Sequence, residues 1–131
     1  MNLKGLKIGV PTEVMKNERR VAATPETVKK MAAEGAEVLV QVGAGDGSFY
    51  HDEDYVAAGA KMVADAEEIF NESDIILKVK EPQFNQTKNK HEVDMMRKDQ
   101  VLISFIHPAT PSNHEMVNNL AQKGVLSFTL D

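Results

Sequence analysis

The stretch EVLVQVGAGDGSFY, Glu37–Tyr50, decides which kind of α/β domain this sequence can form. Its first half is an apolar run rich in valine, which predicts a buried strand. Its second half is a glycine-rich turn, Gly43–Gly47, in the place where dinucleotide-binding domains hold a pyrophosphate. The first question is therefore whether this turn binds a nucleotide or only reverses the chain.

The glycine spacing and the residues after the turn argue against a nucleotide site. A dinucleotide fingerprint reads Gly-x-Gly-x-x-Gly, opens into a long apolar helix, and is followed by an acid about 20 residues later. Here the spacing within Gly43–Gly47 is Gly-x-Gly-x-Gly, and the next residues, Ser48–Asp54, are largely polar. The acids at a suitable distance, Glu67 and Glu68, fall inside a predicted helix. We therefore predict a tight turn, and no cofactor-binding motif within the chain.

On both sides of this stretch, short apolar runs alternate with amphipathic segments, which is typical of an α/β domain with a parallel sheet. The expected strands are Leu6–Val10, Glu37–Val42, Asp74–Lys80, Val101–Ile106 and Val125–Thr129. Helices are expected at 25–34, 52–58, 65–71, 91–97 and 112–123. The strand Val101–Ile106 is the most apolar and is expected to be central. The predicted fold is a Rossmann-like (flavodoxin-like) three-layer α/β domain with a mostly parallel sheet of about five strands.

Composition sets the broad class. The chain has 131 residues, of which 42% are hydrophobic and 27% charged, as in an ordinary globular domain. A net charge of -5 argues against a general nucleic-acid binder, which normally carries a basic stripe. The absence of cysteine from the sequence excludes disulfides and thiolate chemistry. Because no apolar run approaches the roughly 20 residues of a membrane span, we expect a cytoplasmic chain without membrane insertion.

Ligands of open parallel sheets gather beyond the carboxyl ends of the strands, so the residues there are the candidates for chemistry. Arg19 and Arg20 follow the first predicted strand, Lys78 and Lys80 end the third, and His107 follows the fourth. An arginine could bind a carboxylate with its two-pronged guanidinium, and a lysine could polarise a carbonyl. An imidazole could act as acid or base near neutral pH.

Each candidate also has a purely structural interpretation. An arginine could form an ion pair with Glu13 or Glu18, a lysine could lie at the rim of the sheet, and His107 could bond a backbone carbonyl. The four histidines show no spacing typical of metal ligands, so no metal site is predicted.

Three blocks of the sequence resemble one family. They are KIGVPTEVMKNERRVAATPETV, VLVQVGAGDGSFYHDEDYVAAGAKMV and DIILKVKEP, which are similar to the N-terminal domain shared by alanine dehydrogenases and NAD(P) transhydrogenases. The resemblance covers nearly the whole chain in the right order. It implies that residues 1–131 form the first domain of a longer parent protein, and that the NAD-binding domain that follows in this family is absent here. A chain that stops two residues after its last predicted strand agrees with that expectation.

The two branches of the family imply different roles. In the alanine dehydrogenase branch, the resemblance implies that Arg20 and Lys80 hold the carboxylate and carbonyl of pyruvate or alanine, and that His107 serves in proton transfer. The second half of the chain, from NKHEVDMM to SFTLD, resembles instead the transhydrogenase α subunit, whose corresponding block reads LISFxxPAQ. His107 departs from that branch, which usually carries a bulky aromatic residue there. We give the longer block more weight and expect the transhydrogenase α subunit, with alanine dehydrogenase as the alternative and a non-catalytic binding or assembly module as a third reading.

The preferred branch implies hydride transfer from NADH to NADP⁺, with NAD(H) and NADP(H) as cofactors of the intact enzyme. This domain would be a scaffold and one wall of the NAD(H) cleft. The implied partners are the NAD-binding domain of the same parent chain, the β and membrane subunits, and further copies of the chain in a homo-oligomer. The location would be cytoplasmic, peripheral to the inner membrane, and the isolated chain is expected to be inactive.

Overall fold

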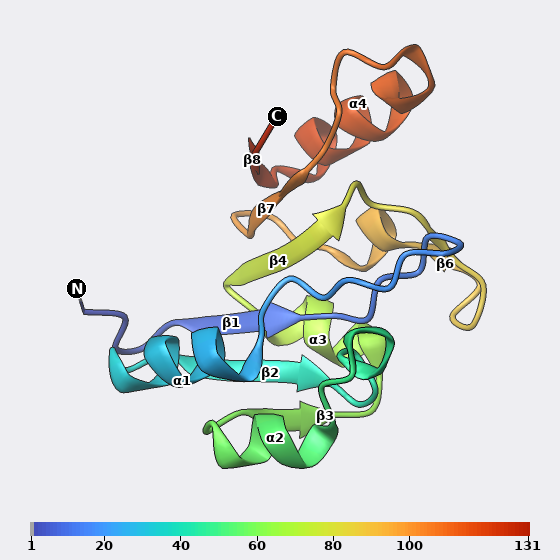
Figure 1. Ribbon diagram of the computed structural model, residues 1–131. Coiled ribbons are helices and arrows are strands. Elements are labelled where there is room, and N and C mark those ends of the chain that lie inside the picture. The colour runs from blue at the N-terminus through green and yellow to red at the C-terminus, as the bar shows by residue number, and fades with distance from the viewer. Residues whose placement is uncertain (1) are drawn as a thin grey trace.

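Six short strands pair in parallel into one sheet in the computed structural model, which describes residues 2–131 (Figure 1). They are β1 (Lys7–Val10), β2 (Glu37–Gln41), β3 (Lys61–Val63), β4 (Ile75–Lys80), β7 (Val101–Phe105) and β8 (Leu126–Thr129). Their order across the sheet is β3-β2-β1-β4-β7-β8, and every pairing is parallel. The order reverses between β1 and β4, which makes this the switch point of a doubly wound sheet. The predicted α/β, Rossmann-like fold is confirmed.

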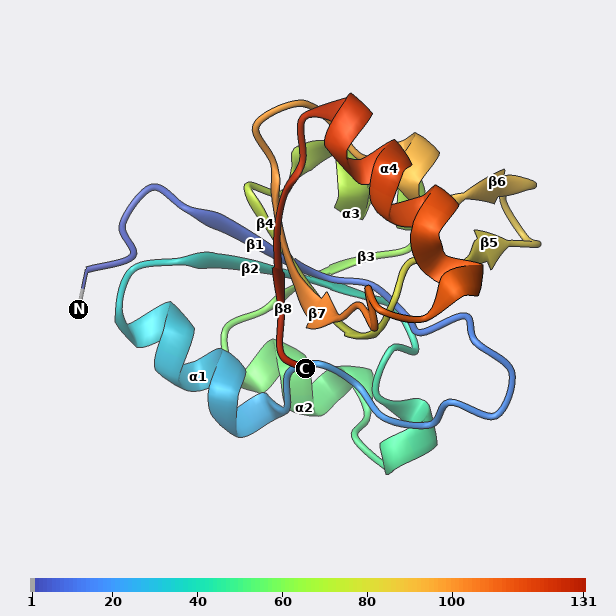
Figure 2. The same ribbon diagram turned by 90° about the horizontal axis from the view of Figure 1, so that it is seen from above.

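Helices cover both faces of the sheet (Figure 2). The α-helices are α1 (Pro25–Ala33), α2 (Asp52–Ala57), α3 (Ala66–Glu72) and α4 (His114–Lys123). Single turns of 3₁₀ helix are η1 (Asp46–Ser48), η2 (Glu92–Met95) and η3 (Pro111–Asn113), and a small hairpin consists of β5 (Phe84–Asn85) and β6 (Lys90–His91). Among the described helices, none is long and apolar enough to cross a membrane.

The alternation of side chains along β2 shows how the sequence builds two cores. Val38 and Val40 point to the face covered by α1 and α2, and Leu39 points to the face covered by α3, η2 and α4. All three are essentially inaccessible to solvent. Since successive side chains of a strand point to opposite faces, a run that is apolar at every position predicts a strand covered on both sides.

Three expectations from the sequence need correction. The sheet has a sixth strand, β3, which is only three residues long and was not predicted. The strand β7 lies next to the edge strand β8 and is not central, because β1 and β4 occupy the middle of the sheet. The helix expected at 91–97 is reduced to the single 3₁₀ turn η2.

At the β8 end of the sheet, strands β7 and β8 keep one apolar face that the described helices leave open. Leu126, Phe128 and Leu130 alternate along and just beyond β8, and each is more than half exposed. Phe105 of β7 is 37% exposed. Helices α1 and α2 lie over β2 and β3 instead (Figure 2). This part of the sheet therefore presents an apolar surface next to the strand ends discussed below.

Candidate functional site

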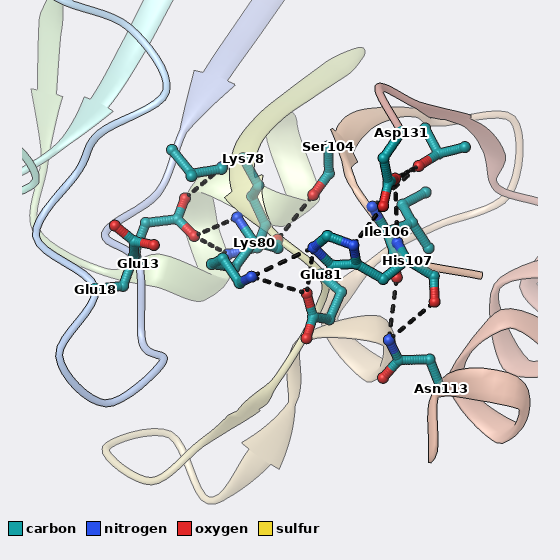
Figure 3. Close-up of polar contacts among 12 residues, drawn as sticks. Glu13, Glu18, Lys78, Lys80, Glu81, Ser104, Ile106, His107, Asn113 and Asp131 are labelled. Atoms are coloured by element: carbon teal, nitrogen blue, oxygen red, sulfur yellow. Dashed lines mark hydrogen bonds and ion pairs between the residues drawn. The ribbon is translucent and has the colours of Figure 1, made fainter. Parts of the chain in front are cut away.

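Lys80 and His107 meet at one edge of the sheet, where β4 and its neighbour β7 end (Figure 3). The Lys80 Nζ atom lies 3.3 Å from the His107 Nε2 atom. The carboxylate of Glu81 adjoins both, with its Oε2 atom 3.7 Å from Lys80 Nζ and 3.9 Å from His107 Nε2. An ammonium, an imidazole and a carboxylate thus converge at the carboxyl ends of adjacent strands, as the sequence predicted for the first two.

The His107 ring is held from the side opposite Lys80. Its Nδ1 atom contacts the carboxylate of Asp131, and its backbone N–H donates to Asp131 Oδ1 at 3.3 Å. Its backbone is left-handed (φ 52°), and Asn113 Nδ2 donates to the carbonyls of both Ile106 and His107 at 3.2 Å. A carboxylate at Nδ1 favours the tautomer with the hydrogen on Nδ1, which makes Nε2 the atom that can accept or exchange a proton.

The two lysines of β4 have different partners. Lys78 is buried, with its Nζ atom 3.1 Å from Glu13 Oε1 and 3.3 Å from Glu92 Oε1. Burial lowers the pKa of Lys78, but the two carboxylates outweigh that effect and raise the pKa above its ordinary value. Burial raises the pKa of Glu92, although Lys78 opposes the shift. Lys78 is therefore a structural cation, and Lys80 is the lysine that reaches the site.

Arg20 forms a two-pronged ion pair with Glu18. Its Nε atom donates to Glu18 Oε2 at 2.9 Å and its Nη2 atom donates to Glu18 Oε1 at 2.7 Å. These bonds lower the pKa of Glu18 to about 2. The structure therefore contains the ion pair with Glu18 that the structural interpretation of Arg20 predicted. Arg20 also lines an open cleft of about 550 Å³, whose wall includes Leu77 and Ile103. Within residues 2–131, no hydrogen bond joins Arg20 to Lys80 or His107.

The glycine turn of the opening stretch is a tightly packed turn. Gly43 has φ 82°, and its N–H donates to Asp52 Oδ1 at 2.9 Å. A Cβ atom on Gly45 would lie 2.7 Å from the carbonyl oxygen of Tyr50 and 2.7 Å from the ring of Tyr55. The packing of the turn against its own chain therefore accounts for the glycine at position 45 without a bound pyrophosphate.

We expect Gly45→Ala to lower the free energy of unfolding by about 1–3 kcal/mol, because an added methyl group would displace backbone and a buried ring. Urea denaturation measures this loss. Gly5→Ala is a comparison and not a matched control: Gly5 (φ 86°) has nothing within 4 Å of the added Cβ atom and shows the cost of a positive φ alone, whereas Gly45 (φ -93°) has no such cost. A Gly45→Ala variant as stable as the wild type would contradict a packed turn.

Comparison with known proteins identifies the family. The model of the family "Alanine dehydrogenase/PNT, N-terminal domain" matches residues 9–131. The chain belongs to this family. It is 43% identical over 102 residues to the alanine dehydrogenase of Mycolicibacterium smegmatis, which covers 78% of this chain and 26% of that protein. It is 33% identical over 126 residues to the NAD(P) transhydrogenase subunit alpha of Cereibacter sphaeroides, which covers 96% of this chain and 23% of that protein.

A solved structure agrees with this assignment. An L-alanine dehydrogenase superposes with a TM-score of 0.84 at 33% sequence identity, over 95% of this chain and 32% of that one. The chain therefore spans about a quarter to a third of the length of these relatives. Its relatives are oxidoreductases, and the chain corresponds to one domain of them.

Proposed function

We propose that this chain is the substrate-side domain of an NAD-dependent amino-acid dehydrogenase of the alanine dehydrogenase type. The observation that carries the proposal is the 3.3 Å approach of Lys80 Nζ to His107 Nε2 at the ends of two adjacent strands. A protonated amine beside an imidazole is suited to a small 2-oxo acid, whose carbonyl must be polarised and whose oxygen or nitrogen must exchange a proton. The higher identity to an alanine dehydrogenase than to a transhydrogenase subunit supports the same choice.

Each residue then has a defined role. The Lys80 ammonium donates to the carbonyl oxygen of the substrate and stabilises the negative charge that develops there. His107 exchanges the proton through Nε2 while Asp131 holds Nδ1. Arg20 binds the substrate carboxylate when the ligand replaces Glu18 in its guanidinium fork. A nicotinamide cofactor would supply the hydride. Since the glycine turn lacks the spacing of a dinucleotide fingerprint, we propose that a further domain of the parent protein would hold this cofactor.

The decisive experiment is an assay of the full-length parent protein with L-alanine and NAD⁺, and with pyruvate, ammonium and NADH. We expect turnover in both directions by the parent and none by the 131-residue chain alone. The control is hydride transfer from NADH to an NADP⁺ analogue by the same preparation. A parent that carries out only this transhydrogenation would overturn the proposal.

The transhydrogenase α subunit is the second candidate. Coverage does not separate the two candidates, because the alanine dehydrogenase of Bacillus subtilis aligns over 95% of the chain and the Cereibacter subunit over 96%. What favours the second candidate is the resemblance of the second half of the chain, from NKHEVDMM to SFTLD, to the transhydrogenase branch. In that role the parent passes hydride from NADH to NADP⁺, and this domain is a scaffold and one wall of the NAD(H) cleft. This candidate also implies membrane and β subunits as partners, a homo-oligomeric arrangement, and a cytoplasmic position at the inner membrane.

A further inference from the structure

We infer that Glu13 is a positioning residue for Lys80: its buried carboxylate fixes the backbone at the end of β4 and thereby sets where the Lys80 ammonium meets His107. The catalytic consequence rests on the proposed function. The structural part rests only on the contacts of Glu13, and it is tested separately below.

The end of β4 departs from regular pairing, and Glu13 bonds the backbone there. In the β4–β7 ladder, Leu77 pairs with Ile103 and Lys80 with Phe105, so β4 contains one residue more than β7 between these two pairs. This is a β-bulge, which leaves part of the backbone outside the regular ladder. On the other side of β4, the register with β1 ends at Ile76. Beyond Ile76, a side chain from the loop after β1, and not β1 itself, accepts hydrogen bonds from the backbone of β4.

That side chain is Glu13 (Figure 3). Its Oε2 atom accepts from the N–H of Val79 at 2.9 Å, and its Oε1 atom accepts from the N–H of Lys80 at 3.0 Å. Two successive amides of the bulge thus donate to the two oxygens of one carboxylate. The carbonyl of Lys80 is fixed as well, because the buried Ser104 donates its Oγ hydrogen to it at 2.8 Å. Both polar groups of the Lys80 backbone are therefore held by buried side chains, and only its ammonium is left to act at the site.

Burial and charge make the Glu13 carboxylate a rigid anchor. The side chains of Lys78, Glu13 and Glu92 are 0%, 2% and 0% exposed. Lys78 donates to Glu13 Oε1 at 3.1 Å, and Glu92 Oε1 accepts from the N–H of Gln83 at 2.8 Å. A buried carboxylate that accepts three hydrogen bonds, one of them from a cation, has no solvated alternative position. The loop after β1, the bulge of β4 and η2 are tied together through this cluster.

Glu13→Gln is the informative variant and Glu92→Gln is its matched control. Glutamine keeps the size of Glu13 but has one acceptor oxygen, so one of the two bulge amides loses its partner. Glu92→Gln makes the same chemical change in the same cluster and leaves the Val79 and Lys80 amides bonded. Should unbalanced Lys78 prevent Glu13→Gln from folding, the double variant Glu13→Gln, Lys78→Met removes that buried charge and still breaks the anchor.

Two readouts on the 131-residue chain test the structural part. We expect at least a tenfold faster hydrogen exchange of the Val79 and Lys80 amides in Glu13→Gln. We also expect the NMR resonance of His107 Nε2 to move toward its position in a Lys80→Met variant. Glu92→Gln should change neither. Unaltered amide exchange in Glu13→Gln, or an unmoved imidazole resonance despite faster exchange, would overturn the inference.

Kinetics of the full-length parent test the catalytic part. A displacement of about 1 Å at a catalytic group can cost about 10²-fold, so kcat for pyruvate amination should fall by about 10–100-fold in Glu13→Gln and by less than about threefold in Glu92→Gln. Equal losses in the two variants would show that Glu13 acts only on stability. A wild-type parent without amino-acid dehydrogenase activity would overturn the proposed function, and the exchange and imidazole measurements would still decide whether Glu13 positions Lys80.

Discussion

Replacing His107 with asparagine is expected to lower kcat of the full-length parent for alanine deamination by about 10²–10⁴-fold, the usual contribution of a positioned acid or base. Asparagine is the replacement of choice because His107 has φ 52°, a left-handed backbone that asparagine tolerates better than most residues. It removes the imidazole Nε2 that lies 3.3 Å from Lys80 Nζ. The fold should survive, so the loss reports on proton transfer.

The control for this prediction is the same substitution at His114, an exposed residue that begins α4. His114→Asn should keep kcat within about twofold of the wild type, as expected for a surface substitution away from the site. A His107→Asn variant that retains nearly full alanine deamination would exclude the assigned role. Unchanged transhydrogenation in the same variant, with no deamination by the wild type, would favour the second candidate.

Much of the fold follows from the sequence because strands such as β2 are covered on both faces. Runs such as Val38–Val40 are apolar at every position and leave little choice of structure. The missed strand β3 carries no such signal, since Lys61 is exposed and the strand is held mainly by pairing with β2. The expected start of the last helix was also displaced: Asn113 uses its side chain on the carbonyls of Ile106 and His107 and does not cap α4 through it.

The site was predictable where it depends on strand ends and not where it depends on distant pairing. Lys80 and His107 end adjacent parallel strands, so the topology alone brings them to one edge. The sequence offered Glu13 only as an arginine partner, whereas its partner is Lys78, 65 residues away. A signal was present nonetheless: a lysine within the apolar strand IILKVK must be paired if it is buried, which requires a carboxylate from elsewhere in the chain.

Replacing Lys78 with methionine is expected to lower the free energy of unfolding by about 3–5 kcal/mol, the cost of removing one partner from a buried ion pair. The variant leaves the carboxylates of Glu13 and Glu92 buried without their cation. Lys80→Met is the control, because the Lys80 side chain is 20% exposed and is not enclosed in this cluster. Urea denaturation of both variants at neutral pH measures the difference, and equal losses would contradict a structural role specific to Lys78.

The same cluster predicts how the stability of the Lys78→Met variant depends on pH. Burial raises the pKa of Glu92 above its ordinary value of 4.5, so between these two pKa values the folded chain binds a proton more strongly than the unfolded chain. That contribution to stability is complete below pH 4.5 and is lost as the pH rises through the raised pKa. Removing Lys78 takes away the charge that opposes this shift, so the stability deficit of Lys78→Met relative to the wild type should be smaller at pH 5 than at pH 8.

Adding Glu13→Gln and Glu92→Gln to Lys78→Met removes all three buried charges and should recover most of the lost stability. A triple variant no more stable than Lys78→Met would show that packing, and not unpaired charge, sets the cost.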